Sequence, residues 1–141
     1  MKEEHSRTAM LLGEKATERL QNSHVIIFGL GGVGSYTAEA LARAGTGSLT
    51  LVDGDKISLS NINRQLYALH STVGCYKTEV ARARISDINP DCRVDIITDF
   101  VNKDNIDLFF SKSYDFCVDA IDDTNAKTAI AVKCAELGIP L

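Results

Sequence analysis

The sequence predicts an α/β fold with a doubly wound, mainly parallel sheet, and three features predict it. Apolar runs at 24–28 and 48–52 have the length and character of buried parallel strands. The first run leads directly into Gly29-Leu30-Gly31-Gly32-Val33-Gly34, and a helical pattern follows. The second run ends in Asp53. Strand, glycine turn, helix, strand and acid, in this order, form the layout of a nucleotide-binding βαβ unit.

The helices before residue 70 follow from periodicity and from glycine positions. A helix is predicted over 6–22, with an apolar face formed by Leu11, Leu12, Ala16 and Leu20. The helix after the glycine turn is predicted over 32–44, because Gly45-Thr46-Gly47 is a C-terminal helix signal. A short helix is predicted over 61–69.

The rest of the chain continues the alternation of helix and strand. A helix is predicted over 77–88, ending before Asn89-Pro90 because proline disfavours the helical conformation of its predecessor. Strands are predicted at 93–97, where apolar residues alternate, and at 115–120, which is continuously apolar. The other predicted elements are helices over 103–110 and 124–137 and the opening of a strand at 138–141. A doubly wound sheet rarely ends on an opening strand, so we expect further strands beyond this chain.

Length and composition indicate one Rossmann-like domain over 1–141, which we expect to be the N-terminal part of a longer protein. The net charge of −4 argues against a generic basic surface for nucleic acid, although it leaves room for a local basic groove. The N-terminus lacks the apolar core of a signal peptide, and no apolar run approaches the length of a membrane span. We therefore expect a cytoplasmic location. The four cysteines lack CxxC spacing, which favours reduced thiols over a zinc site.

The glycine segment is the first candidate binding site. Glycines permit close approach of backbone to phosphate, and the helix that follows offers unpaired amides to an anion. The spacing alone is a weak signal, and a merely tight strand-to-helix turn is the alternative. Asp53 ends the second strand, where an acid accepts hydrogen bonds from ribose hydroxyls. Asp55 is interpreted primarily as a turn residue.

Two cations separate a triphosphate site from a dinucleotide site. Arg64 and Gln65 lie on a polar segment after the Asp53 turn, and Lys77 opens the next predicted helix. A nucleoside triphosphate carries most of its charge on the β and γ phosphates, which charge-assisted hydrogen bonds stabilise. A solvated surface cation is the alternative for each residue, and for Lys77 taken alone it is the preferred one.

Three aspartates follow the apolar run at 115–120, namely Asp119, Asp122 and Asp123. Open α/β sheets bind ligands at the carboxyl ends of their strands, and a carboxylate facing a triphosphate usually holds Mg²⁺. We expect one of the three to do so and Asp123 or Thr124 to cap the next helix. The histidines have no evident catalytic partner, and no nucleophile is evident.

These motifs resemble those of a known family. Over the whole chain the sequence resembles the ATP-binding half of the ubiquitin-activating-enzyme-like superfamily, which includes the MoeB and ThiF adenylyltransferases. The matching motifs are Gly29-x-Gly31-Gly32-x-Gly34, Leu51-Val52-Asp53-x-Asp55, Asn61-x-Asn63-Arg64-Gln65, Val73-Gly74-x-x-Lys77, Ile88-Asn89-Pro90 and Asp119-Ala120-Ile121-Asp122. Within the superfamily it looks most like the tRNA threonylcarbamoyladenosine dehydratases (the TcdA group, also called CsdL). The cues include Arg7-Thr8-Ala9 and Asn63, where many adenylyltransferases carry glutamine.

The resemblance implies a set of roles. The glycines Gly29, Gly31, Gly32 and Gly34 would lie at the phosphates, and Asp53 with Asp55 would lie at the nucleoside. The triphosphate would be held by Asn61, Arg64, Gln65 and Lys77, and Mg²⁺ by Asp122. Arg7 would reach into the partner subunit's site, which implies a homodimer. Cys75-Tyr76 and Asp123 depart from the family pattern, but neither departure removes a core motif.

The implied chemistry is ATP-dependent activation of a carboxylate through an acyl-adenylate. In the dehydratase group the carboxylate belongs to threonylcarbamoyladenosine at position 37 of tRNA, and ring closure releases AMP without an enzyme nucleophile. The alternative is activation of the C-terminal glycine of a ubiquitin-like sulfur carrier protein, for which CxxC pairs beyond residue 141 would be expected. Sulfur-transfer proteins are further implied partners. A NAD-binding module would leave Arg64, Lys77 and Asp122 idle, and a non-catalytic scaffold would not need them.

Overall fold

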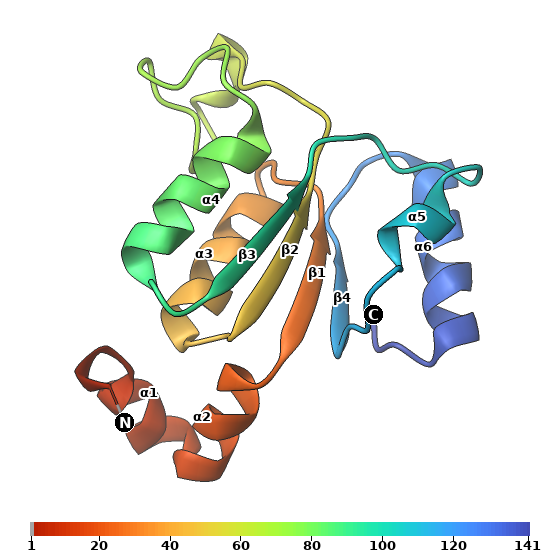
Figure 1. The fold of residues 1–141 in the computed structure, drawn as a ribbon. Coiled ribbons are helices and arrows are strands. Elements are labelled where there is room, and N and C mark those ends of the chain that lie inside the picture. The colour runs from red at the N-terminus through yellow and green to blue at the C-terminus, as the bar shows by residue number, and fades with distance from the viewer. Residues whose placement is uncertain (1) are drawn as a thin grey trace.

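The computed structural model describes residues 2–141 and has a four-stranded parallel sheet at its centre (Figure 1). The strands are β1 (His24–Phe28), β2 (Ser48–Val52), β3 (Arg93–Ile97) and β4 (Phe116–Asp119), in the order β3-β2-β1-β4. In the register, His24 pairs with Ser48, Ser48 with Arg93, and Val25 with Phe116. The carboxyl ends of all four strands therefore lie at one edge. The predicted fold class is confirmed.

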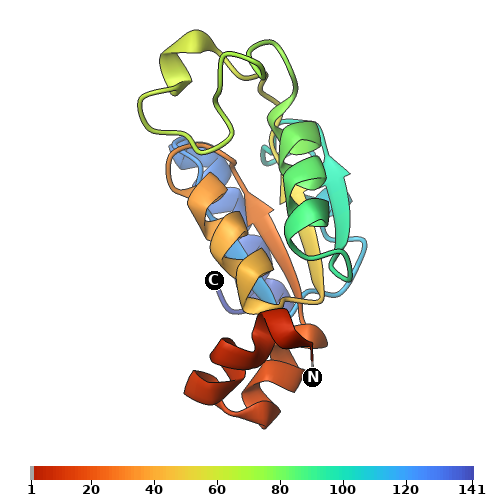
Figure 2. The ribbon, with the colours of Figure 1, turned by 90° about the vertical axis from the view of Figure 1, so that its left-hand side faces the viewer.

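Helices cover both faces of the sheet. The helices α3 (Gly34–Ala44) and α4 (Lys77–Ile88) lie on one face, and α5 (Ile106–Phe109) and α6 (Thr124–Leu137) lie on the other (Figures 1 and 2). Successive strand side chains point to opposite faces, so β1 supplies Val25 and Ile27 to one core and Ile26 and Phe28 to the other. Both cores are closed by apolar helix residues, which are Ala38, Ala42, Ala81 and Ile85 on one side and Phe109, Ile130 and Cys134 on the other.

The prediction of one helix over 6–22 is wrong. A 3-10 turn η1 (Glu3–His5) precedes two helices, α1 (Ser6–Leu12) and α2 (Glu14–Gln21), with Gly13 between them at φ 85° and ψ 159°. This backbone conformation lies outside the helical region, and glycine adopts it without a steric penalty. The change of direction leaves Leu11 85% exposed, and no residue of α1 is buried.

The predicted helix over 61–69 is also absent. A single 3-10 turn η2 (Leu59–Asn61) is followed by irregular turns, which bring Tyr67 and Ala68 into the core beside α3. The Tyr67 hydroxyl donates a hydrogen bond to the carbonyl oxygen of Ser35 at 3.3 Å. Burial of this aromatic ring against α3 therefore determines the path of the segment, and helical periodicity does not.

Local hydrogen bonds shorten the predicted helix over 103–110 to α5. The side-chain oxygen of Asn102 accepts from the amides of Asp104 and Asn105, and the Asn105 side chain accepts from the Asn102 amide. These bonds occupy backbone donors in a non-helical turn, as asparagine side chains commonly do. The helix consequently starts after Asn105.

The last residues form no strand, but they lie beside β4. The carbonyl oxygen of Pro140 accepts a hydrogen bond of 2.9 Å from the amide of Cys117. Within residues 2–141, none of the helices combines the length and apolar character that a bilayer crossing requires.

Candidate nucleotide-binding site

A cavity of about 790 Å³ lies at the carboxyl ends of the strands. Its walls come from the glycine turn after β1, the segments after β2, β3 and β4, and the first residue of α4. Of the residues predicted for the site, Gly34 and Arg7 lie outside the lining. The structure brings together in the lining Gly29, Gly31, Gly32, Asp53, Asp55, Asn61, Arg64, Gln65, Lys77 and Asp122.

The four glycines of the turn have two different functions in the fold. Gly29 has φ 92°, and a β-carbon there would lie 2.5 Å from the carbonyl oxygen of Ala120, so only glycine allows β4 to approach. A β-carbon on Gly34 would overlap the carbonyl oxygen of Gly29, so this residue allows α3 to pack onto the strand end. Gly31 and Gly32 face the cavity, where the nearest atoms to an added β-carbon would be 3.5 Å and 3.7 Å away.

The start of α3 offers donors to an anion. Val33 precedes the helix without a side-chain capping hydrogen bond, and it lines the cavity together with Gly31 and Gly32. The first amides of an α-helix have no intrahelical acceptor, and the helix dipole places partial positive charge there. The arrangement suits a phosphate group.

Asp53 connects the two strand ends beneath the cavity. Its Oδ2 accepts a 2.8 Å hydrogen bond from the amide of Leu30, and its Oδ1 accepts one of 2.8 Å from the amide of Asp55. The carboxylate thus holds the glycine turn against the end of β2. Each carboxylate oxygen has a second lone pair, so Asp53 can still accept from a ligand hydroxyl.

Lys77 is a buried cation at the cavity wall. Its side chain is 7% exposed, and Nζ lies 3.9 Å from Oδ2 of Asp55, an exposed carboxylate. Its amide also donates to the carbonyl oxygen of Asp55 at 3.1 Å. The interpretation of Lys77 as a solvated surface cation is therefore wrong. A buried ammonium group with one long ion pair is suited to an anionic ligand, which would complete its neutralisation.

Arg64 lies at the exposed rim of the cavity. Its Nη1 donates to the carbonyl oxygen of Ser60 at 3.1 Å and to Oδ1 of Asn63 at 2.8 Å, which orients the guanidinium group. Gln65 is buried beside Gly31, whereas Asn61 uses its side-chain oxygen to accept from the Ser58 amide at 2.9 Å. Asn61 therefore shapes the turn as well as lining the cavity.

The structure separates the three aspartates after β4. Oδ1 of Asp119 accepts from Nζ of Lys127 at 3.0 Å, and Asp123 caps α6 by accepting from the amide of Ala126 at 2.8 Å. Asp122 lines the cavity and makes no hydrogen bond or ion pair within residues 2–141. Asp123 also lines the cavity, but its Oδ1 is used by the helix cap, so Asp122 is the one of the three whose carboxylate has both oxygens unengaged within residues 2–141.

The donor set fits Mg²⁺ in one particular way. The described part of the chain has no group of three or more His, Cys, Asp or Glu side chains that could hold a metal ion. Mg²⁺ in nucleotide sites is usually held by one or two carboxylates and the substrate phosphates, with water completing the shell. The single free carboxylate of Asp122 fits that pattern.

Arg7 is not brought to this cavity. It lies on α1, which sits at the amino-terminal edge of the sheet, whereas the cavity is at the opposite edge (Figures 1 and 2).

Phe100 is a lining residue that sequence reasoning missed. It follows β3, its side chain is 60% exposed, and a β-carbon on Gly54 would lie 2.6 Å from its ring. Asp99, Val101 and Asn102 line the cavity with it. Their position directly after a parallel strand was the available signal, because such positions converge on the same edge as the glycine turn.

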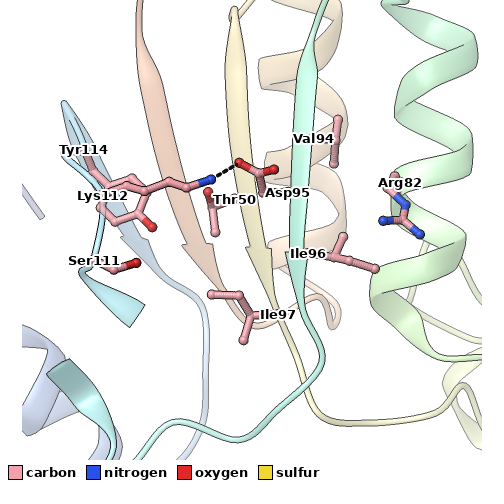
Figure 3. Close-up of a pocket in the computed structure, with 9 residues that line it drawn as sticks. All are labelled: Thr50, Arg82, Val94, Asp95, Ile96, Ile97, Ser111, Lys112 and Tyr114. Atoms are coloured by element: carbon pink, nitrogen blue, oxygen red, sulfur yellow. Dashed lines mark hydrogen bonds and ion pairs between the residues drawn. The ribbon is translucent and has the colours of Figure 1, made fainter. Parts of the chain in front are cut away.

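A second cavity, of about 380 Å³, lies along β3 and contains no predicted site residue (Figure 3). Two of its charged lining residues are paired with each other, since Nζ of Lys112 lies 2.7 Å from Oδ2 of Asp95, and the same oxygen lies 3.3 Å from Arg93 outside the lining. Nearby, Nε2 of His24 lies 2.7 Å from Oγ1 of Thr50, and burial lowers the pKa of this imidazole. The first pair connects β3 to the segment before β4, and the second connects β1 to β2.

Comparison with known proteins gives concordant results. Residues 5–141 match the ThiF family. The sequence is 46% identical over 134 residues to tRNA threonylcarbamoyladenosine dehydratase of Escherichia coli, covering 95% of this chain and 50% of that protein. It is 34% identical over 139 residues to the adenylyltransferase and sulfurtransferase MOCS3 of Drosophila willistoni, covering 97% of this chain and 30% of that protein.

The fold is similar to a solved structure with a nucleotide. The crystal structure of the E. coli dehydratase in complex with ATP superposes with a TM-score of 0.96 at 45% identity, covering 98% of this chain and 57% of that chain. This chain spans about half the length of the curated dehydratases that it matches.

Proposed function

Because the chain belongs to the ThiF family, we propose that it binds ATP in the cavity described above and uses it to activate a carboxylate. The observation that carries this proposal is the burial of Lys77 in the wall of a cavity that the glycine turn also lines. A dinucleotide needs no such cation, whereas the terminal phosphates of ATP do. The ATP complex of the similar E. coli structure supports the choice of nucleotide.

The proposal assigns a role to the main polar groups of the cavity and to its glycines. The amides at the start of α3 and the open sides of Gly31 and Gly32 receive the phosphates, and Asp53 accepts from the ribose. Lys77 and Arg64 stabilise negative charge on the pyrophosphate as it leaves the α-phosphorus. Asp122 would hold Mg²⁺, which when bound neutralises phosphate charge and orients the chain of phosphates.

The substrate that we propose is tRNA carrying N6-threonylcarbamoyladenosine at position 37. The carboxylate of its threonyl group attacks the α-phosphorus of ATP, and pyrophosphate leaves. The ureido group of the same side chain then closes a ring on the activated carbonyl carbon, and AMP leaves. The net change is the loss of one water from the nucleoside. No enzyme nucleophile is needed, in accord with the sequence, and the dehydratase name of the relatives at 43–47% identity supports this choice.

The second candidate is an adenylyltransferase that activates the C-terminal glycine of a ubiquitin-like carrier protein, with sulfur-transfer proteins as partners. The 34% identity to MOCS3, which is named an adenylyltransferase and sulfurtransferase, favours keeping it. The first half of the reaction would be the same, because both substrates present a carboxylate to the α-phosphorus.

We also propose that the protein acts as a homodimer in the cytoplasm. Arg7 lies far from the cavity of its own chain, and the exposed apolar residues of α1 suit a contact with a second subunit. In that arrangement Arg7 of one subunit would approach the phosphates bound by the other.

The decisive experiment incubates the full-length protein with Mg-ATP and tRNA that carries threonylcarbamoyladenosine, and then measures nucleoside masses. The proposal predicts a nucleoside lighter by one water, formed only with ATP and lost in the Lys77→Met variant. Unchanged tRNA together with adenylation of a carrier protein would instead establish the second candidate. Unchanged tRNA and no adenylation would reject both.

A further inference from the structure

We propose that the ion pair of Asp119 and Lys127 positions Asp122 in the cavity and so sets the affinity of the site for Mg-ATP. The inference rests on the proposed function, since Asp122 needs a defined position only if it meets a metal–phosphate group. Neither residue of the pair lines the cavity, so both would act through the segment that joins β4 to α6.

Asp119 forms hydrogen bonds with two other residues of this part of the chain. It is the last residue of β4, where it pairs with Phe28, and its Oδ1 accepts from Nζ of Lys127 at 3.0 Å. The same oxygen accepts from the amide of Ile121 at 3.2 Å. One carboxylate oxygen thus connects the strand end both to the backbone next to Asp122 and to Lys127 in the first turn of α6.

The segment is also held against the glycine turn. The amide of Ala120 donates to the carbonyl oxygen of Phe28 at 2.8 Å, and the carbonyl group of Ala120 lies directly against Gly29. On the other side of Asp122, Asp123 caps α6. Asp122 therefore lies between two fixed points, while its own side chain has no partner within residues 2–141.

The pair also has an electrostatic consequence. Asp119 is 16% exposed and Lys127 is 42% exposed, so solvent screens the carboxylate only in part. Without Lys127, the carboxylate of Asp119 would be a second uncompensated negative charge near the glycine turn. It could also move away from the Ile121 amide. Lys127 engages Asp119 and the Ala126 amide engages Asp123, so Asp122 is the one of the three whose carboxylate has no partner within residues 2–141.

The test is the nucleotide affinity of full-length variants, measured by calorimetric titration of ATP with Mg²⁺ and again with EDTA. Partners that orient a metal ligand typically change metal affinity by tenfold or more, so Lys127→Met and Asp119→Ala should each raise the Kd for Mg-ATP roughly tenfold. In EDTA the loss of positioning should have no effect, so any change in the Kd for ATP should be smaller than the change for Mg-ATP and should follow the sign of the removed charge. Lys127→Arg should restore the Mg-dependent affinity.

Lys127→Met removes a positive charge and Asp119→Ala removes a negative one. The two variants therefore distinguish a role in positioning Asp122 from a simple electrostatic effect on the bound nucleotide. Removing a cation weakens the binding of an anion, whereas removing a carboxylate strengthens it. Weaker Mg-ATP binding in both variants therefore supports positioning, and opposite shifts would overturn it. The matched control is Asp107→Asn. Asp107 pairs at 2.7 Å with Lys133, which lies on α6 like Lys127, but neither Asp107 nor Lys133 lines the cavity. It should leave both affinities unchanged.

Asp122→Asn distinguishes failure of this inference from failure of the metal site. If Asp122→Asn reduces Mg-ATP affinity and the pair variants do not, the positioning role is rejected and the metal site stands. If Asp122→Asn has no effect, the metal site itself is rejected, and the positioning role with it. Melting temperatures of all variants, measured without nucleotide, identify any loss that comes from unfolding.

Discussion

Gly34 lies so close to Gly29 that a β-carbon on Gly34 would overlap the Gly29 carbonyl oxygen. This contact places the start of α3 directly on the end of β1. By contrast, a β-carbon on Gly32, which lines the cavity, would make ordinary van der Waals contact with Arg64, at 3.7 Å from its side chain and 3.8 Å from its carbonyl oxygen. Two glycines of one motif therefore serve packing and ligand access separately.

The first prediction follows from this difference. Gly34→Ala should destabilise the protein strongly, because backbone atoms cannot move away as a side chain can, and overpacking of this kind typically costs about 1–3 kcal/mol or more. Gly32→Ala should leave the free energy of unfolding nearly unchanged and weaken ATP binding at least tenfold. Urea denaturation and ATP titration of both variants provide the comparison. A stable Gly34→Ala variant that merely loses ATP binding would contradict the packing role.

The second prediction concerns Lys77. Lys77→Met keeps the volume of the buried side chain and removes its charge, so the fold should be retained or slightly stabilised. A charge-assisted hydrogen bond contributes roughly 1.5–3 kcal/mol, so the Kd for ATP should rise at least tenfold. Lys56→Met is the matched control, because Lys56 is exposed and lies outside the cavity lining. Equal ATP affinity of Lys77→Met and Lys56→Met would show that Lys77 does not contribute to ATP binding.

The third prediction concerns Phe100. An aromatic ring that is 60% exposed at the wall of a nucleotide cavity can stack on a base, which contributes about 1–3 kcal/mol. Phe100→Ala should therefore weaken ATP binding, with little change in melting temperature. Leu108→Ala, an exposed apolar residue on α5 outside the lining, should change neither property. Unaltered nucleotide affinity in Phe100→Ala would mean that the base lies elsewhere.

The fourth prediction is a pH dependence of stability at Glu39. Hydrogen bonds from Arg84, at 2.7 Å and 3.0 Å, and from Arg43, at 2.9 Å, hold the pKa of Glu39 below its usual value. A carboxyl with a lowered folded-state pKa contributes stability above its unfolded pKa and loses it as the pH falls through the folded value. Glu39→Gln should thus lower the free energy of unfolding at pH 7.

The stability of Glu39→Gln at low pH tests whether the ionised carboxylate is responsible. The difference between wild type and Glu39→Gln should shrink as the pH falls below about 4, near the ordinary pKa of a glutamate. Urea denaturation across this range measures it. Glu18→Gln is the control, since Glu18 is exposed and forms no ion pair in the described chain. A pH-independent difference for Glu39→Gln would show that packing, and not charge, accounts for the loss.

Local sequence was sufficient for elements whose own residues determine them. The bounds of β1, β2, β3, α4 and α6 agree with the prediction, because apolar periodicity, the Asn89-Pro90 pair and the aspartate before α6 are all local signals. The helices predicted over 6–22 and 61–69 failed for non-local reasons. Gly13 redirects the chain between α1 and α2, and Tyr67 is drawn into the core beside Ser35.

The sequence by itself determined that a glycine turn between a strand and a helix, an acid after β2 and two later cations occur in one chain. Only the tertiary structure decided which of these residues line the cavity and which hold the fold around it. Parallel strands bring their carboxyl ends to one edge, which places Lys77, Gly31 and Asp122 around one cavity although they lie far apart in the chain. Burial of Lys77, the pairing of Asp119 with Lys127 and the contact of Gly34 with Gly29 are relations between distant segments. Because burial and contact are properties of the packed molecule, no local pattern in the sequence expresses them.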